Sequence, residues 1–189
     1  MVEYSGRHGR KQAIRNKPVR FGYKVWCQNT PRGYLCAFDV YQGKTYQGDE
    51  DLENLLGNCP STVFHLLSYY SVEKKYLPYH FFFDNLFTTT PLLTELRKNG
   101  YDAIDTLRSN RLEKNCQIKS VICMDKSDRG SYDAVTSKRE DIEINITRWK
   151  DNAVVTMAST CLREDPIGKV RRWSKQSSKH IQVNIPHVV

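Results

Sequence analysis

The chain has 189 residues, of which 39% are hydrophobic and 26% are charged, and its formal net charge is +8. This composition is typical of a globular protein and excludes a disordered tail. The sequence holds no apolar run of about 18 residues, which excludes a membrane span, and its basic, polar N-terminus excludes a secretory signal peptide. The positive charge suits a polyanionic partner, although many unrelated proteins share it.

The cysteines are scattered and form no Cys-x-x-Cys pair, and no histidine stands near them at ligand spacing. A tetrahedral zinc ion is usually bound by two closely spaced pairs of cysteine or histidine ligands on two short turns, so the cysteine spacing argues against a zinc site. Without a signal peptide, reduced thiols are the better interpretation. The six positions are Cys27, Cys36, Cys59, Cys116, Cys123 and Cys161.

The first twenty residues are interpreted as a basic loop. Between residues 4 and 20 the chain has six cations and no acidic residue, and no apolar periodicity organises the segment. Cations gathered on one surface are what contact with DNA phosphates requires. The candidate DNA-binding residues here are Arg7, Arg10, Lys11, Arg15 and Lys17.

Strand and helix signals alternate from residue 21 to residue 111. An aromatic, alternating run, a turn and a second strand predict an antiparallel hairpin over 21–41. Three consecutive aromatics, Phe81 to Phe83, predict a strand buried on both faces, and Thr-Thr-Thr-Pro then begins a helix through Leu96. The predicted order is β-β-α-β-α-β, with strands 21–27, 34–41, 79–85 and 101–107 and helices 60–70 and 88–97.

The remaining part, residues 112–189, reads as a meander of antiparallel strands. Short β-like runs are separated by turn signals such as Asp-Arg-Gly at 128–130. We expect Trp149 and Trp173 to lie in the core of this half, because tryptophan usually buries its large apolar area. The predicted strands are 118–124, 132–136, 142–149, 153–159, 170–173 and 181–185.

Asp84 is the candidate catalytic residue. It follows the aromatic strand and precedes a helix, which places a carboxylate at the carboxyl edge of a sheet, where α/β folds hold ligands and metals. Aspartate is also an ordinary strand-ending and capping residue, so the position by itself leaves both interpretations open.

Four blocks of sequence carry a resemblance to a known family. Asp84-Asn85-Leu86-Phe87-Thr88-Thr89, Thr106-Leu107-Arg108-Ser109-Asn110-Arg111 and Arg148-Trp149-Lys150-Asp151-Asn152 follow one another, with Lys17 to Lys24 ahead of them. Together they resemble the piggyBac transposase family, and most of all the domesticated piggyBac transposable element-derived proteins of animals. The resemblance extends from Tyr4 to Val189.

The resemblance implies an α/β fold with an incomplete ribonuclease-H-like core over 21–111 and a β-rich insertion domain over 112–189. It also implies metal-assisted phosphoryl transfer at TTAA sites, with three aspartates holding two Mg²⁺ ions. Of these aspartates only the second, matching Asp84, falls in this chain, and the family's zinc-binding tail does not. Asp105 stands where the family usually has glycine. Asp39, Asp102 and Asp105 could substitute for missing carboxylates, but none is at a family position.

We therefore expect a piggyBac-derived fragment without catalytic activity and without a bound cofactor. Its incomplete metal site would be Asp84 alone. It would bind DNA weakly and without sequence preference in the nucleus, with Arg108 and Arg111 adding to the N-terminal cations. The alternatives are an active metal-dependent transposase or nuclease, and a protein-interaction remnant that associates with itself or with a longer paralogue.

Overall fold

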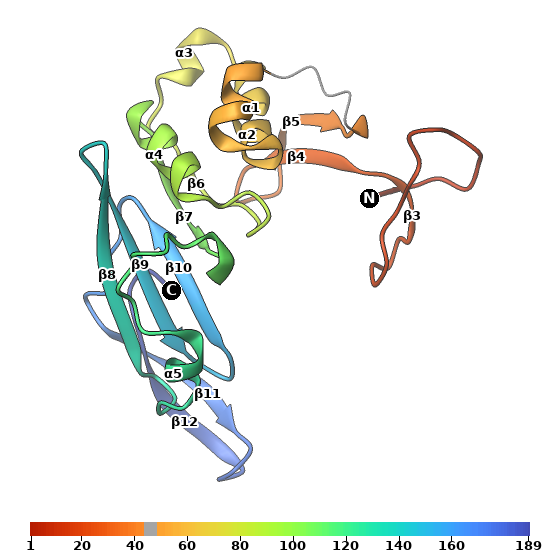
Figure 1. Cartoon of the computed structure of the whole chain (residues 1–189). Helices are drawn as coiled ribbons and strands as arrows, with labels where there is room; N and C mark the ends of the chain where they lie inside the picture. The colour runs from red at the N-terminus through yellow and green to blue at the C-terminus, as the bar shows by residue number, and fades with distance from the viewer. Residues whose placement is uncertain (44–48) are drawn as a thin grey trace. The chain divides into compact units, whose positions relative to one another are not determined.

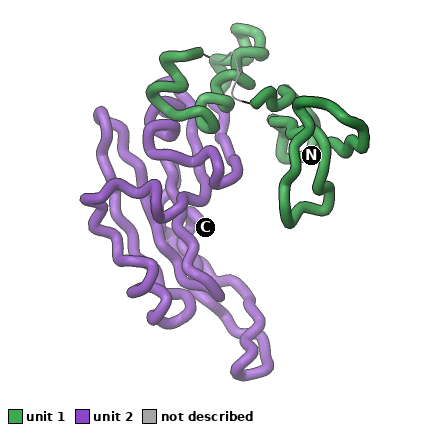
Figure 2. Tube along the Cα trace, turned by 45° about the vertical axis from the view of Figure 1, so that its right-hand side comes forward, with its two compact units in different colours: residues 1–77 green, residues 78–189 purple. Residues whose placement is uncertain are grey.

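The computed structural model describes residues 1–43 and 49–189, and it shows a mixed α/β protein with several sheets (Figure 1). The chain divides into two compact units, residues 1–77 and 78–189, which Figure 2 colours separately. Among the described residues, no helix is long and apolar enough to cross a membrane.

The first unit begins with a small antiparallel sheet in the order β1-β3-β2. Its strands are β1 (Val2–Glu3), β2 (Gln12–Ala13) and β3 (Phe21–Tyr23). The segment interpreted as a loop therefore contains two short strands, β1 and β2, which both pair with β3. Gly22 makes the close approach of β1 possible, because a Cβ atom at this position would lie 2.0 Å from the carbonyl oxygen of Val2.

A hairpin and three helices complete the first unit. The predicted hairpin is present as β4 (Val25–Asn29) paired with β5 (Leu35–Val40), but the predicted strand 21–27 is divided, since residues 21–23 form β3 of the other sheet. The predicted helix over 60–70 is α2 (Asn58–Ser68), followed by α3 (Val72–Lys75). The apolar face of α2 buries Leu66 and Leu67. The acidic stretch before it forms α1 (Glu50–Leu56), because the Asp49 side chain caps the first turn.

The second unit is built on a five-stranded sheet in the order β6-β7-β10-β9-β8. The pair β6–β7 is parallel and the other pairs are antiparallel. A separate hairpin joins β11 to β12. The elements are β6 (His80–Phe81), α4 (Thr90–Lys98), β7 (Asp102–Thr106), the 3-10 helix η2 (Ser109–Arg111), α5 (Val121–Asp125), β8 (Tyr132–Arg139), β9 (Ile142–Lys150), β10 (Val154–Ser159), β11 (Gly168–Ser174) and β12 (Lys179–Ile185).

The core of the second unit lies between α4 and the sheet. Leu92, Leu93 and Leu96 on one side of α4 are fully buried, and α4 packs against β7 and β9. The predicted start of this helix is confirmed, because Thr89 accepts a hydrogen bond from the Leu92 amide and Pro91 occupies the first turn.

The boundary expected at 111/112 lies inside the second compact unit. Across it, β10 pairs with β7 along Met157 to Ser159. The β-rich half thus continues the sheet that carries β6 and β7. Sequence reasoning had no signal for this pairing, because it depends on strand order.

Three expectations about the second unit are corrected. The run 118–124 is not a strand: Ser120 accepts a hydrogen bond from the Cys123 amide and begins α5. The aromatic strand is short, since β6 ends at Phe81 and the Phe82 side chain is 67% exposed. Trp149 is buried as expected, but Trp173 is 51% exposed because β11 and β12 form a two-stranded sheet.

Candidate functional site

Asp84 begins the turn that connects β6 to α4. Its Oδ1 accepts a hydrogen bond from the Leu86 amide at 2.8 Å, and its carbonyl accepts one from the Phe87 amide at 2.9 Å. The residue is exposed. Asp84 therefore fills the ordinary turn-forming role of an aspartate, and no described residue hydrogen-bonds to its second carboxylate oxygen.

Asp105 holds this turn against β7. Its carboxylate accepts hydrogen bonds from the Phe83 amide at 3.1 Å, the Thr88 hydroxyl at 3.2 Å and the Thr106 amide at 2.6 Å. Burial raises the pKa of Asp105 although these hydrogen bonds favour its charged form. Asp105 is thus a positioning group for the turn that begins at Asp84.

Arg111 and Arg108 both reach the turn, but they engage it differently. The Arg111 guanidinium donates to the carbonyls of Asn85, Leu86 and Thr88 at 2.7–3.1 Å. Arg108 is exposed, and its Nε donates to the Asn85 side chain at 2.9 Å, which is its one hydrogen bond to the described residues. The expected DNA contact is geometrically open to Arg108, whereas Arg111 is occupied in holding the turn.

The N-terminal cations also divide into two kinds. Lys11 donates to the carbonyls of Ser5 and Gly6 at 3.2 and 3.1 Å, and its ammonium lies 5.4 Å from the Phe21 ring centre. The other four candidates are exposed, and no described residue forms an ion pair with them. They are Arg7, Arg10, Arg15 and Lys17.

The described residues do not assemble a two-ion Mg²⁺ site around Asp84. Within residues 1–43 and 49–189, Asp84 belongs to no group of three possible metal ligands. The three aspartates that could have replaced the missing carboxylates have other partners. Asp39 lies 3.4 Å from His65, Asp102 forms an ion pair with Arg97, and the Asp105 carboxylate accepts hydrogen bonds from its neighbours. A hard Mg²⁺ ion needs several oxygen ligands close together, so these residues do not fit it.

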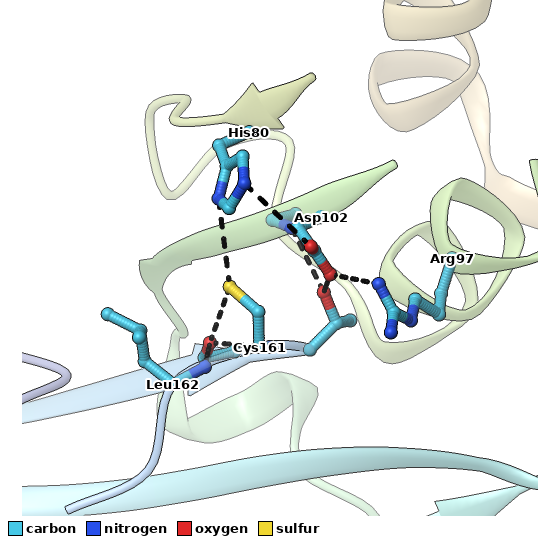
Figure 3. Close-up of polar contacts among 8 residues, drawn as sticks. His80, Arg97, Asp102, Cys161 and Leu162 are labelled. Atoms are coloured by element: carbon cyan, nitrogen blue, oxygen red, sulfur yellow. Dashed lines mark hydrogen bonds and ion pairs between the residues drawn. The ribbon is translucent and has the colours of Figure 1, made fainter. Parts of the chain in front are cut away.

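Sequence reasoning missed a different cluster. His80, Asp102 and Cys161 bring one possible ligand atom each to within 4.8 Å of one another (Figure 3). These residues are distant along the chain, so no spacing motif could have revealed them. They come together because β6 pairs with β7, and β7 pairs with β10.

Comparison with known proteins identifies the family. A family model described as transposase IS4 matches residues 1–187. The human PiggyBac transposable element-derived proteins 2 and 3 are each 38% identical to this chain over all 189 residues. The chain therefore belongs to the piggyBac transposase family, and the resemblance carried by the Asp84 and Arg108 blocks is confirmed.

The aligned region is a part of each relative. The chain spans 31% of human PiggyBac transposable element-derived protein 2 and 30% of protein 3. No solved structure gives a significant match.

Proposed function

We propose that this piggyBac-family chain binds DNA without sequence preference and does not cut it. The exposed N-terminal cations carry this proposal, because four of them lie in a segment without acidic residues and form no ion pair with a described residue. Such cations are free to exchange their counterions for DNA phosphates. A DNA-bound protein would be located in the nucleus.

The turn around Asp84 offers a second phosphate contact. Arg108 is held through Nε by Asn85, which leaves its two terminal nitrogens free of described partners. A guanidinium fixed at one nitrogen is pre-oriented and can still donate to a phosphate through the others. Arg111 supports this contact indirectly, by holding the carbonyls of the turn.

The proposal is tested by the salt dependence of duplex binding. Each phosphate neutralised by a cation contributes about −0.9 to the slope of log K against log salt. A variant with Arg7, Arg10, Arg15 and Lys17 changed to Ala should lose up to about 3–4 units of slope, equally for any DNA sequence.

The matched control removes four exposed cations from the second unit, namely Lys114, Lys126, Lys175 and Lys179. Both variants lose the same charge from +8, so a loss confined to the N-terminal variant supports the proposal. Equal slopes in both variants, or a wild-type affinity independent of salt, would show that the N-terminal cations are only solvated.

The absence of cutting rests on the surroundings of Asp84. The described residues place no group of three metal ligands there, and a two-ion mechanism needs carboxylates that bridge both ions. We expect no nicking of supercoiled DNA in Mg²⁺ or Mn²⁺. Nicking that disappears in Asp84→Ala, while DNA binding is retained, would refute this part.

We further propose that the α/β elements are part of a ribonuclease-H-like core that is incomplete within this chain. In support, the parallel pair β6–β7 with α4 between its strands is the arrangement that places Asp84 after a sheet strand. Residues beyond Arg111 would then be the family's β-rich insertion, although β10 hydrogen-bonds to the core strand β7.

Self-association is the competing function, and exposed apolar residues on the β4–β5 hairpin favour it. Tyr34 is 73% exposed, Phe38 57% and Leu35 46%. Within residues 1–43 and 49–189 no third strand pairs with this hairpin, and an open, apolar edge can pair with the same edge of a second copy. A dimer in analytical ultracentrifugation that Phe38→Lys converts to monomer, with DNA binding unchanged, would favour this role over DNA binding.

A further inference from the structure

Three residues with different ligand chemistries meet at the start of the β6–β7 pair. His80 is the first residue of β6 and lies opposite Asp102, the first residue of β7. Cys161 follows the end of β10, where Thr160 exchanges hydrogen bonds with Ala103. The antiparallel pairing of β10 with β7 therefore delivers the cysteine to the end of the sheet where both other residues begin their strands.

This end of the sheet is separate from the Asp84 turn. The Phe83 amide, next to Asp84, bonds to Asp105, which is three residues further along β7 than Asp102. Three residues of a strand extend about 10 Å. The cluster thus belongs to the opposite end of the β6–β7 pair from the candidate catalytic carboxylate.

The imidazole of His80 lies between the other two side chains (Figure 3). Its Nδ1 is 4.0 Å from the Cys161 Sγ, and its Nε2 is 4.0 Å from the Asp102 Oδ2. Ligands of a tetrahedral zinc ion lie about 3.3–3.8 Å apart, given bond lengths of about 2.0–2.3 Å. These two contacts use different ring nitrogens, whereas one ion binds a single nitrogen, so the distances that matter are those of up to 4.8 Å between one ligand atom of each residue. Closing on an ion requires shifts of up to about 1–1.5 Å, which the His80 side chain, 56% exposed, has room to make.

Asp102 is already oriented for this role. Its Oδ1 accepts hydrogen bonds from the Arg97 guanidinium at 2.5 Å and from the Thr160 hydroxyl at 3.2 Å. These contacts leave Oδ2 directed at His80. Hydrogen bonds of this kind commonly fix the ligands of a metal site, and the Arg97 charge reduces the affinity without blocking the free oxygen.

We propose that His80, Asp102 and Cys161 bind one Zn²⁺ ion, with water in the fourth position. An imidazole nitrogen, a thiolate and a carboxylate suit a borderline-soft ion, whereas Mg²⁺ takes oxygen ligands only. Binding releases the thiol proton to solvent and forms the sulfur–zinc bond. The ion joins the ends of β6, β7 and β10, so it stabilises the second unit.

The same residue types could form a nucleophilic triad, but the surroundings disfavour it. The His80 Nε2 lies 4.0 Å from the Asp102 Oδ2, beyond the reach of about 2.6–3.2 Å over which a third group orients the base of such a triad. A bound cation instead draws the three groups together and deprotonates the thiol.

The test titrates the purified 189-residue chain, stripped with a chelator, with ZnCl₂ in a calorimeter. We expect one equivalent to bind, with affinity lowered at least about tenfold in Cys161→Ser and in His80→Ala. Cys123→Ser, which changes an exposed cysteine on α5, is the matched control and should bind as wild type. Because His80 is exposed, its variant keeps the fold, which circular dichroism checks.

Two further measurements make the outcome decisive. Co²⁺ in place of zinc should give a thiolate-to-metal charge-transfer band that Cys161→Ser abolishes. Zinc should also raise the melting temperature of the wild type and of Cys123→Ser, but not of Cys161→Ser, because an ion that binds only the folded state stabilises it. No saturable zinc binding, or binding unchanged in Cys161→Ser and His80→Ala, would overturn the proposal.

Discussion

Replacing Trp149 with Ala should be among the most destabilising single changes in the second unit. The indole is only 3% exposed, and its Nε1 donates to the Asn184 carbonyl on β12 at 2.7 Å. A tryptophan buries about 200 Å², which at about 25 cal/mol per Å² is an upper estimate of about 5 kcal/mol. With the lost hydrogen bond and partial relaxation of the cavity, we expect a loss of about 3–5 kcal/mol.

Trp173 supplies a control of the same residue type. Its side chain is 51% exposed and packs edge-on against His180, with ring centres 5.2 Å apart. Trp173→Ala should therefore cost less than about 2 kcal/mol, and Trp149→Phe should fall between the two. Urea unfolding followed by far-ultraviolet circular dichroism measures all three variants. Equal losses for the two alanine variants would refute the assignment of Trp149 as the anchor between β9 and β12.

The Asp84 turn yields two further predictions. Burial raises the pKa of Asp105 above its ordinary value of 3.8, so ionising it costs more in the folded than in the unfolded chain. Its stabilising contribution is complete below about pH 4 and falls as pH rises through the folded-state pKa. Asp105→Asn should lose stability because its amide nitrogen cannot accept the hydrogen bonds that both carboxylate oxygens accept. This loss relative to wild type should shrink as the pH rises above about 4, and a loss that grows with pH in denaturant titrations would contradict the assignment. Arg111→Ala should lower the free energy of unfolding in urea by about 2–3 kcal/mol, because three carbonyls lose a charged donor. Arg108→Ala should leave the stability nearly unchanged and weaken DNA binding. The reverse pattern would show that the two roles are exchanged.

Much of the local structure could be predicted from short-range sequence patterns. Thr89 and Pro91 indicated where α4 begins, and the alternating aromatics around Trp26 indicated the β4–β5 hairpin. The family could be recognised from motifs such as Asp84-Asn85, because a motif is defined by residue types at fixed positions in the sequence and needs no knowledge of the fold. The run 118–124 misled prediction, since its apolar residues suit a strand as well as a helix and the Ser120 cap decided the outcome.

The roles of individual side chains depended on strand order and register. Trp149 and Trp173 lie in similar sequence contexts, but only β9 is flanked by strands on both sides. The sequence predicted Arg111 as a DNA-binding residue, but in the structure its guanidinium donates to three backbone carbonyls. His80, Asp102 and Cys161 carry no spacing signal at all. Hydrophobic periodicity determines whether a segment forms a helix or a strand, whereas the pairing of distant strands determines which side chains meet. That pairing is a property of the whole sheet and cannot be predicted from a short stretch of sequence.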